Sequence, residues 1–348
     1  MSGEEALAPS TAEEPPPLWR HLDLGRCDPL RAQAFVESVA ESVAAGEVPN
    51  TLLTAQPNAP YVSLGFHQSF SEEIDEGFLA RRRVPVLRRV EGGGTTWLDA
   101  DQWFYQLAYR EEGGGPGGPA DLVRFLRAPV AAARHLGLAA ELRAPSDLVV
   151  GERKVSGNAG GDWEGAHLLV GGILGRADHR AMADLLKLPH PAIRPILRAE
   201  IERRVTSWEA ETGSPPAYGE WRDHLVEAFR AEGLFRSRPG RPTPAEETRF
   251  RTETTARHGD PSWRELPPVA KAPGPVVRRL RIAGPHGLLV LSASGADPFR
   301  VAVVDGSAVR EAYVVDAPAG REGARRLAEG TDEFAEVSRD VANAPGFG

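Results

Sequence analysis

The sequence predicts an α+β protein in which short strands, several of them paired as hairpins, alternate with amphipathic helices. Three observations favour this class. Apolar residues recur at helical spacing in stretches such as 30–45 and 120–136, which is typical of helices with one buried face. Residues 61–66 and 101–109 are short runs rich in aromatic and β-branched residues, as expected of strands. Turns containing Gly, Asn, Asp or Pro separate these runs and favour hairpins.

Composition and charge exclude several classes of protein. With 348 residues, the chain can bury a substantial core and form one large domain plus a smaller one. No apolar run approaches the ~20 residues needed to span a bilayer, so no membrane partner is expected. The net charge of −8, from 41 Lys and Arg against 49 Asp and Glu, argues against a nucleic-acid binder. A single cysteine, Cys27, excludes an intrachain disulfide and a cysteine-cluster metal site. We expect a cytoplasmic protein.

The N-terminal residues precede the first predicted helix. Residues 1–17 are acidic and rich in Ala and Pro, and they lack the apolar stretch of a secretory signal, so we expect a disordered lead-in. A helix is predicted over 30–45 because Asp28 can cap it, Pro29 suits its first position, and Gly46 can stop it.

The elements that follow show the same two patterns. Strands are predicted over 51–54, 61–66, 101–109, 138–142, 148–150 and 167–174. Helices are predicted over 71–82, 120–136, 182–188, 193–208 and 218–232. The Gly- and Pro-rich stretch 111–119 has no adjacent Lys-Ser/Thr pair, so a surface loop is expected there and not a P-loop.

The last third of the chain is predicted to hold a linker and a small appendage. Residues 236–275 are rich in Pro, Arg, Thr and Glu, which indicates a linker wrapped on the surface. Residues 276–314 give three or four alternating strands, and 322–337 give a helix. We expect a small α+β accessory domain over 276–348, whose role the sequence leaves open.

A triple glycine, Gly92–Gly94, follows Arg88 and Arg89 and separates two short strand candidates, 85–87 and 95–97. Glycines let a ligand approach the backbone, and exposed N–H groups there can bind an anion. The two guanidinium groups could add forked donors for a carboxylate or phosphate. The alternative is a flexible hairpin tip with two solvated arginines, and this stretch alone does not separate the two interpretations.

A second stretch, 147–159, is predicted to form a strand, a Gly-Glu turn and a second strand that Lys154 opens. Small residues follow the lysine, among them Ser156 and Gly157. Taken alone, Lys154 could be an ordinary exposed hairpin lysine, and Asp147 could merely bind the turn backbone. The small residues could also mark close packing between two elements.

Taken together, these two stretches resemble the motifs of the lipoate–protein ligase family. The residues that carry the resemblance are Arg88-Arg89-x-x-Gly92-Gly93-Gly94 and Asp147-Leu148 followed by Lys154-x-Ser156-Gly157-x-Ala159. The order and spacing of the motifs make the match specific. It spans about residues 55–235 and includes 64–68, 73–75 and 204–207, and residues 257–263 resemble a motif close to the end of the family's catalytic domain.

The resemblance implies both a fold and an activity. The implied fold is a mixed or antiparallel sheet flanked by helices, as in the biotin and lipoate ligases, with the catalytic domain over 18–235. The implied activity is ATP-dependent attachment of lipoate, or octanoate, through an acyl-adenylate to a lysine of a lipoyl carrier domain. That carrier would be a 2-oxoacid dehydrogenase E2 or a protein like the glycine-cleavage H protein. ATP and Mg²⁺ are implied as cofactors and lipoate as the substrate.

The resemblance also implies which residues form the site. Lys154 is the implied catalytic residue, holding the acid's carbonyl oxygen and the α-phosphate together. Asp147 is the implied carboxylate for Mg²⁺. The residues implied to bind lipoate and ATP are Arg89, Gly92, Gly93, Gly94, Thr95, Asp147, Ser156, Gly157 and Ala159.

Three positions depart from the family motifs. Glu91 replaces Ser or Thr and places a carboxylate in the glycine stretch, where we expect it to turn outward or to pair with Arg88. Leu98 replaces a His, and Ser146 replaces an Asn. These departures suggest an altered substrate, or a non-catalytic member of the family that binds lipoyl domains or acyl groups.

A further alternative is octanoyl or lipoyl transfer without ATP. Related transferases carry the acyl group on a cysteine shortly before the lysine hairpin. Cys27 lies far upstream of Lys154, which disfavours this alternative.

Overall fold

The computed structural model describes residues 15–110, 119–267, 276–283, 286–291, 299–305, 308–315 and 324–343. Residues 1–14 of the expected lead-in and 111–118 of the expected loop lie outside the described residues. The helices are α1 (Pro29–Ala44), α2 (Phe70–Glu73), α3 (Glu76–Arg82), α4 (Pro119–His135), α5 (His179–Asp184), α6 (Ile193–Arg204), α7 (Trp208–Thr212), α8 (Tyr218–Ala231), α9 (Pro244–Arg249), the π-helix η1 (Phe250–Thr254), α10 (Thr255–Gly259), α11 (Pro261–Arg264) and α12 (Asp332–Ala342). The strands are β1 (Leu18–Cys27), β2 (Thr51–Pro57), β3 (Tyr61–Leu64), β4 (Val86–Arg88), β5 (Thr96–Leu98), β6 (Gln102–Tyr109), β7 (Glu141–Arg143), β8 (Asp147–Val150), β9 (Arg153–Trp163), β10 (Ala166–Leu174), β11 (Arg236–Pro239), β12 (Val276–Ala283), β13 (His286–Leu291), β14 (Phe299–Asp305), β15 (Ala308–Val315) and β16 (Arg325–Arg326).

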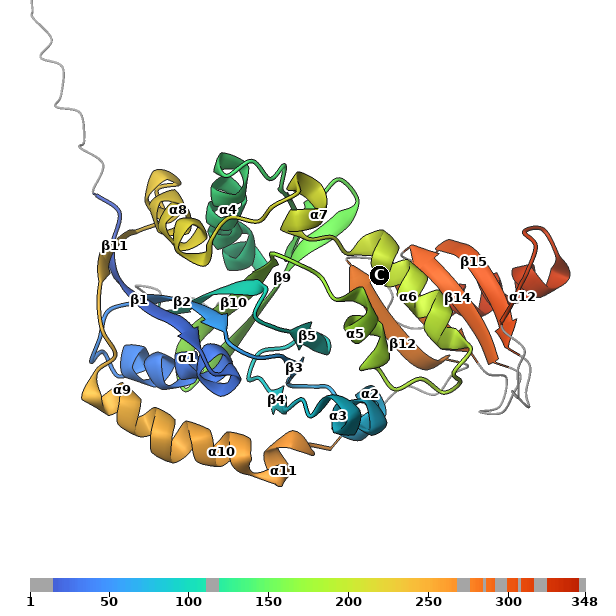
Figure 1. The fold of residues 1–348 in the computed structure, drawn as a ribbon, viewed down its shortest axis with the longest axis horizontal. Coiled ribbons are helices and arrows are strands. Elements are labelled where there is room, and N and C mark those ends of the chain that lie inside the picture. The colour runs from blue at the N-terminus through green and yellow to red at the C-terminus, as the bar shows by residue number, and fades with distance from the viewer. Residues whose placement is uncertain are drawn as a thin grey trace, which may run out of the picture.

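A mixed sheet of eight strands forms the centre of the fold, in the order β11-β1-β2-β6-β10-β9-β8-β7. The strand β1 runs parallel to both β11 and β2, and from β2 to β7 every neighbouring pair is antiparallel. Figure 1 shows α4 and α8 on one side of this sheet and α1 on the other. The expected α+β class, with a mixed sheet flanked by helices and a small C-terminal appendage, is confirmed.

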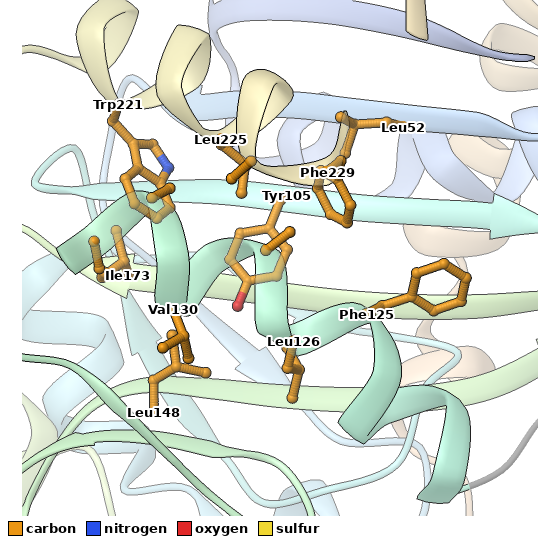
Figure 2. Packing of buried hydrophobic residues seen from close by; sticks show 14 of the residues in the cluster. Leu52, Tyr105, Phe125, Leu126, Val130, Leu148, Ile173, Trp221, Leu225 and Phe229 are labelled. Atoms are coloured by element: carbon orange, nitrogen blue, oxygen red, sulfur yellow. The ribbon is translucent and has the colours of Figure 1, made fainter. Parts of the chain in front are cut away.

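The two faces of the sheet carry separate apolar cores. On one face, Tyr105 of β6 packs with Leu126 of α4 and with Leu225 and Phe229 of α8, as Figure 2 shows. On the other face, α1 lies against β2, β6 and β10 through a stripe that includes Phe35. The helix begins as the sequence predicts, because Asp28 accepts a hydrogen bond from the Arg31 backbone N–H at 3.0 Å.

A small second sheet, ordered β4-β3-β5, lies on the side of the large sheet that α1 covers. Its pairing differs from one interpretation of the sequence. The sequence left open that the triple glycine is the tip of a hairpin, but its two flanking strands both pair with β3 and not with each other. The strand β4 is parallel to β3, and β5 is antiparallel to it. The glycine stretch therefore crosses over β3, and both of its ends are fixed by the same strand.

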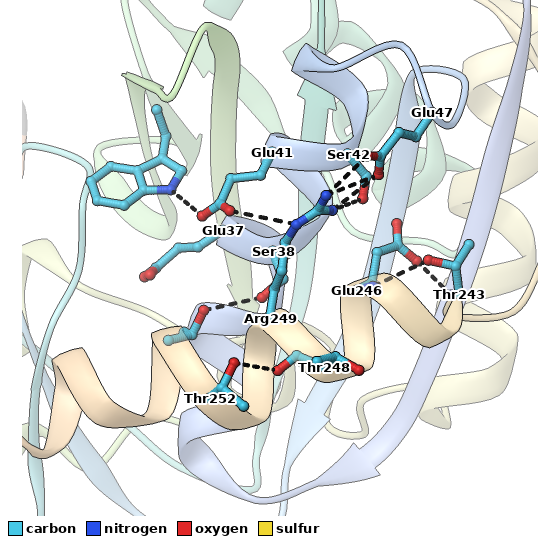
Figure 3. A network of polar contacts seen from close by, with 12 residues as sticks. Glu37, Ser38, Glu41, Ser42, Glu47, Thr243, Glu246, Thr248, Arg249 and Thr252 are labelled. Carbon is cyan, nitrogen blue, oxygen red and sulfur yellow. Dashed lines mark hydrogen bonds and ion pairs between the residues drawn. The ribbon is translucent and has the colours of Figure 1, made fainter.

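The linker expected over 236–275 is largely helical in its described part. The helices α9, η1, α10 and α11, residues 244–264, run across the outer side of α1 (Figure 1). We call this segment the helical strap. Thr243 and Glu246 form a capping box at its start, and Arg249 donates to Glu47 and to the Ser42 hydroxyl of α1 (Figure 3). The charged residues that suggested an exposed linker instead pair with α1.

The C-terminal strands form an antiparallel five-stranded sheet, ordered β12-β13-β14-β15-β16. One face packs on α6, and Leu288 and Val301 of the sheet share an apolar cluster with Leu197 of that helix. The other face packs on α12 through residues such as Val337. The helix predicted over 322–337 begins later, at Asp332, because Thr331 provides the N-cap and residues 325–326 pair with β15 instead.

Several element boundaries differ from the predictions. The strand β1 was not predicted, because charged and polar residues interrupt its apolar pattern. The helix predicted over 71–82 divides at Ile74, which forms a β-bridge with Leu186. The helix predicted over 193–208 ends at Arg204, because Val205 leaves the helix to form a bridge with Lys154. None of the helices among the described residues is long and apolar enough to cross a bilayer.

The buried ion pair between Arg20 of β1 and Glu246 of the helical strap gives a test of this arrangement. The two side chains are 8% and 0% exposed, and Arg20 Nη2 lies 2.5 Å from Glu246 Oε1. Glu246→Ala leaves a buried guanidinium unpaired, so we expect the free energy of unfolding to fall by about 3 kcal/mol. Denaturant unfolding measures the loss.

Glu227→Ala is the matched control, because the Glu227–Arg230 pair is exposed at 55% and 60%. We expect this control to change stability by less than about 0.5 kcal/mol. Equal effects of the two substitutions would contradict the role assigned to the strap contact.

Candidate active site

A β-bulge at the start of β9 sets the direction of the Lys154 side chain. Val149 pairs with Lys154 and Leu148 pairs with Ser156, so Val155 is the additional residue. Lys154 and Gly157 are three residues apart, and regular alternation would place them on opposite faces of the sheet. The bulge adds one residue and places the lysine side chain on the face of Gly157. A Cβ built on Gly157 would lie 3.2 Å from Lys154 Nζ, in agreement with this placement.

Both the side chain and the backbone of Lys154 are held by neighbouring residues. Its Nζ lies 2.7 Å from Asp147 Oδ1, and the lysine side chain remains 25% exposed. Asp147 stands directly opposite Gly157 on β8, so all three share one face. The lysine carbonyl accepts a hydrogen bond from the Thr206 N–H at 2.8 Å. The result is a fixed, partly accessible ammonium group, rather than the free hairpin lysine that the sequence allows.

Small residues continue along β9 on the Lys154 face. Gly157, Ala159 and Gly161 alternate with residues that point to the other side, and a Cβ on Gly160 would meet Leu122 of α4 there. We call Gly157, Ala159 and Gly161 the small-residue strip. Gly157 is exposed and Ala159 is half-buried, although β9 lies inside the sheet and not at its edge.

The strip connects the two sequence motifs. At its far end, a Cβ on Gly161 would lie 3.4 Å from the Cα of Glu91, which directly precedes the glycine stretch. Lys154 therefore lies at one end of the strip, and the segment leading into Gly92–Gly94 lies at the other.

Ser156 is not on this face. Its hydroxyl lies 3.4 Å from the Tyr105 hydroxyl, which donates to Asn158 Oδ1 at 2.5 Å. Asn158 in turn donates to the Ser146 carbonyl at 2.6 Å. These contacts lie on the α4 side of the sheet, opposite the small-residue strip, and they stabilise the Lys154 hairpin from that face. The binding role expected of Ser156 stays a prediction, and the structure does not bring this residue to the strip.

Arg89 is buried beneath the glycine stretch. Its Nη2 donates to the carbonyls of Gly92 (2.6 Å) and Gly94 (2.9 Å), and its Nε donates to Gly92 at 3.1 Å. Its Nη1 donates to the Ser63 carbonyl and hydroxyl on β3. Burial lowers the pKa of Arg89. The alternative of a solvated arginine is therefore wrong. The phosphate-binding role expected of Arg89 stays a prediction, and its three nitrogens already donate within the protein.

This arrangement orients the amides of the glycine stretch. In a planar trans peptide, a carbonyl and the next N–H point in opposite directions. Because the Gly92 and Gly94 carbonyls face Arg89, the N–H groups of Gly93 and Thr95 point away from it. None of the Gly92–Gly94 amides donates to a described residue. Two backbone amides that point the same way can both donate to an anion, so Arg89 positions a candidate anion site. The Thr95 hydroxyl is buried there without a partner among the described residues.

Arg88 is also buried and ties two distant segments together. Its Nη1 donates to the carbonyls of the turn after β3, at 2.6 Å to Phe66 and 2.7 Å to Gln68. Its Nε and Nη2 donate to the carbonyls of Trp263 (2.8 Å) and Arg264 (2.6 Å). The helical strap thus ends on the residue next to Arg89, and Arg88 takes a structural role instead of facing a ligand.

Glu91 is neither turned outward nor paired with Arg88, so both expectations for it are wrong. The residue is 2% exposed, and its Oε1 has no hydrogen-bond partner among the described residues. Burial, together with the nearby Glu37 carboxylate, raises the pKa of Glu91 to about 7, although Arg89 opposes the shift. The Arg88 guanidinium already donates to backbone carbonyls, which explains why it forms no ion pair with Glu91.

Cys27, the single cysteine, ends β1 and packs against the apolar cluster of the small sheet. Burial, strengthened by Asp28, raises the pKa of its thiol to about 12. The group is therefore a neutral thiol near pH 7 and a poor nucleophile. Cys27 and Lys154 lie on strands separated by three others in the large sheet.

The described residues do not form a resident magnesium site. No group of three or more His, Cys, Asp or Glu side chains within them could hold a metal ion, and Asp147 is bound to Lys154. Two surface hollows, of about 410 and 680 Å³, lie away from the strip. Leu79 and Arg264 line the first, and Arg127 and Leu142 line the second.

Comparisons with known proteins point to one family. Residues 28–230 match the model of the lipoyl protein ligase A/B catalytic domain. An octanoyltransferase LipM from Symbiobacterium thermophilum is 31% identical over 70% of this chain and 97% of its own length.

Solved structures share the fold. One is a bi-partite archaeal lipoate protein ligase from Thermoplasma acidophilum, reported together with its E2 lipoyl domain. It has a TM-score of 0.61 and 21% identity, over 74% of this chain and 98% of that one. A lipoate-protein ligase A bound with ATP has a TM-score of 0.60 and 22% identity, over 71% of this chain and 98% of that one.

The buried Glu91 carboxyl predicts a pH-dependent stability. A pKa near 7 in the folded state, against 4.5 ordinarily, means that the folded chain holds this proton more tightly. The associated stabilisation is present below about pH 4.5 and is lost as the pH rises through 7. Glu91→Gln removes the ionisation, so its free energy of unfolding should rise relative to the wild type by about 2–3 kcal/mol between pH 5 and 8.

Denaturant unfolding at both pH values measures this difference. Glu329→Gln, at an exposed position, is the control, because water solvates both forms of that carboxyl. A difference between Glu91→Gln and wild type that stays constant from pH 5 to 8 would show that Glu91 is not held as described.

Proposed function

Because the chain belongs to the lipoyl protein ligase A/B catalytic domain family, we propose that it attaches an octanoyl or lipoyl group to a lysine of a lipoyl carrier domain through an acyl-adenylate. The family is enzymatic and acts in protein lipoylation. The observation that carries the proposal is the fixed Lys154 ammonium, which lies at one end of the small-residue strip, while the segment that leads to the outward amides of Gly93 and Thr95 lies at the other end.

The first step of the proposed reaction brings two anions together, the carboxylate of the acid and the phosphates of ATP. The carboxylate of the acid attacks the α-phosphate of ATP and displaces pyrophosphate, so the negative charge on both partners has to be offset at one place. Lys154 is a compact cation for the carboxylate and the α-phosphate, and the Gly93 and Thr95 amides are donors for phosphate oxygens. Asp147 acts as a positioning residue that keeps the ammonium over Gly157. Any Mg²⁺ would arrive with the nucleotide.

The second half of the reaction uses the same cation. The amine of the carrier lysine attacks the acyl carbonyl, a C–N bond forms, and AMP leaves with the bonding electron pair. The carbonyl oxygen becomes an oxyanion during attack, and Lys154 stabilises it. The carrier is proposed to be an E2-type or H-like lipoyl domain. The catalytic domain over 18–235 and the cytoplasmic location stay predictions.

A second candidate is octanoyl transfer without ATP. The similarity to an octanoyltransferase over nearly its full length favours it. In this chain the acceptor amine would attack a thioester donor directly and release its thiol, since Cys27 is half-buried and remote from Lys154. Lys154 would again stabilise the oxyanion.

Acyl transfer to a purified lipoyl domain tests the proposal. Full-length protein is incubated with the domain and either octanoate or lipoate plus ATP, or an octanoyl acyl carrier without ATP, and the mass of the domain is measured. Lys154→Ala removes the oxyanion donor and should lower the rate by about 100-fold or more. The control is Lys187→Ala, because the Lys187 ammonium donates only to the Ser71 carbonyl among the described residues.

The two sets of conditions distinguish the candidates. Transfer that requires ATP, together with lipoate-dependent ATP–pyrophosphate exchange, supports the ligase. Transfer from the octanoyl carrier without ATP supports the transferase. Binding of the lipoyl domain without either reaction, or full activity of Lys154→Ala, contradicts the catalytic proposal and favours a non-catalytic binding role.

A further inference from the structure

The hairpin that carries Lys154 can pair in two ways, because β9 has one residue more than β8 in the stretch that contains the bulge. In the structure the additional residue is Val155, and Lys154 pairs with Val149. If the additional residue joined the turn instead, Lys154 would pair with Val150, and its side chain would point to the α4 face. Contacts from outside the hairpin can select between these two registers.

Arg153 directly precedes Lys154 on β9 and points to the other face of the sheet. Successive side chains of a strand alternate between the faces, so Arg153 lies on the α4 face when Lys154 lies on the face of Gly157. In agreement, Arg153 pairs with Val150, which packs against the apolar core beneath α4 and α8. A contact that holds Arg153 on this face therefore keeps Lys154 on the opposite one.

Glu211 of α7 makes such a contact. Its Oε1 lies 2.7 Å from Arg153 Nη2, and the Glu211 side chain is 13% exposed. The helix α7 lies on the same side of the sheet as α4 and α8 (Figure 1), and Trp208 at its start packs in their apolar core. The carboxylate that binds Arg153 thus comes from a helix that the core holds in place.

The same carboxylate oxygen is also linked to the backbone of Lys154. It accepts a hydrogen bond from the Thr206 hydroxyl at 2.5 Å, and the N–H of this buried threonine donates to the Lys154 carbonyl at 2.8 Å. Glu211 is therefore connected to Arg153 directly and to Lys154 through Thr206. Because successive carbonyls of a strand point to opposite edges, adoption of the other register would break both connections together.

We infer that Glu211 is a positioning residue, which selects the bulged register of β9 and so keeps the Lys154 ammonium on the face of the small-residue strip. The inference rests on the acyl transfer proposed at Lys154 and assigns one more residue to it. Asp147 holds the ammonium once the lysine is on that face, whereas Glu211 acts on the strand that carries the lysine. Glu211 does not contact the reacting groups, because α7 lies on the opposite side of the sheet.

The kinetics of acyl transfer by the full-length protein give the first test. Glu211→Ala removes both connections, so a fraction of the molecules should hold Lys154 on the α4 face and contribute no turnover. We expect kcat to fall about tenfold and KM for the lipoyl domain to stay within about twofold, because the remaining molecules bind and react as before. Glu211→Gln keeps an oxygen that accepts from Arg153 and Thr206, so its kcat should stay within about threefold of the wild-type value.

The position of the lysine can also be measured without turnover. The chain has three lysines, Lys154, Lys187 and Lys271, so reductive methylation with ¹³C-formaldehyde gives few side-chain signals in an NMR spectrum, and Lys154→Arg assigns the signal of interest. In the wild type the Asp147 carboxylate, 2.7 Å from the ammonium, should separate this signal from the others. In Glu211→Ala we expect a second Lys154 signal, whose share of the intensity matches the fractional loss of kcat.

Two further variants make the result specific. Arg153→Met removes the ion pair and keeps an aliphatic side chain, so it should produce the same second signal, and it gives an independent reading if Glu211→Ala does not fold. Glu209→Ala is the matched control, because Glu209 lies on the same helix and its carboxylate pairs with Arg176 instead. The control should keep the single Lys154 signal and the wild-type kcat.

The outcomes separate the positioning role from the proposed function. A single, unshifted Lys154 signal in both Glu211→Ala and Arg153→Met overturns the inference, whatever the rate of transfer. Equal effects of Glu209→Ala and Glu211→Ala also overturn it, as does loss of the folded state in both test variants, because the carboxylate would then support the whole domain and not one register. A second Lys154 signal in a protein that transfers no acyl group supports the positioning role and contradicts only the proposed function.

Discussion

One additional residue in a strand determines on which face of the sheet Lys154 lies. Val155 is inserted between two regular pairs of β8 and β9, and it turns the Lys154 side chain to the face of Gly157. On the opposite face, α4 and α8 close over the sheet with an apolar core, and an ammonium group there would lose its water and its charge. The bulge therefore decides whether this lysine can act as a cation at all. Asp147 and the bridge to Val205 hold it where the bulge places it.

The two adjacent arginines stabilise different segments of the chain. Arg89 binds the carbonyls of the glycine stretch from below, and Arg88 binds the turn after β3 and the end of the helical strap. Glycines have high conformational entropy in the unfolded chain, so a stretch of three needs fixed partners to keep one conformation. Guanidinium groups can provide them, because one planar fork donates to several carbonyls at once. A loop with little regular secondary structure thus gains a defined shape.

Local patterns in the sequence predicted the elements whose stability is local. The helix α1 followed from its apolar stripe and from the Asp28 cap, and the Lys154 hairpin followed from its turn and flanking strands. The strand β1 was missed, because Arg20 is buried there only through its contact with Glu246, 226 positions along the chain. The strap was missed for a related reason, since its charged residues find their partners on α1.

The candidate site was predictable to a similar extent. The motifs identified Lys154, Asp147 and the glycine stretch, and the fold brings Lys154 and Asp147 together. The inward Glu91 and the bulge at Val155 depend on pairing partners that no local spacing encodes. The position of Glu211 carries no sequence signal, because this glutamate matches no motif. Only the structure shows that its carboxylate contacts Arg153, the residue before the lysine.

The helical strap also bears on how the protein is made. The ribosome releases α1 and the other seven strands of the large sheet before β11 and residues 244–264, which pair with β1 and cover the outer side of α1. During that interval the edge of β1 is unpaired, and charged side chains of β1 and α1 lack their partners on the strap. Both features favour association with other chains. Lys154 and Asp147 can thus be in place while these groups are still exposed, and the fold is complete only when the helices of the strap have been synthesised.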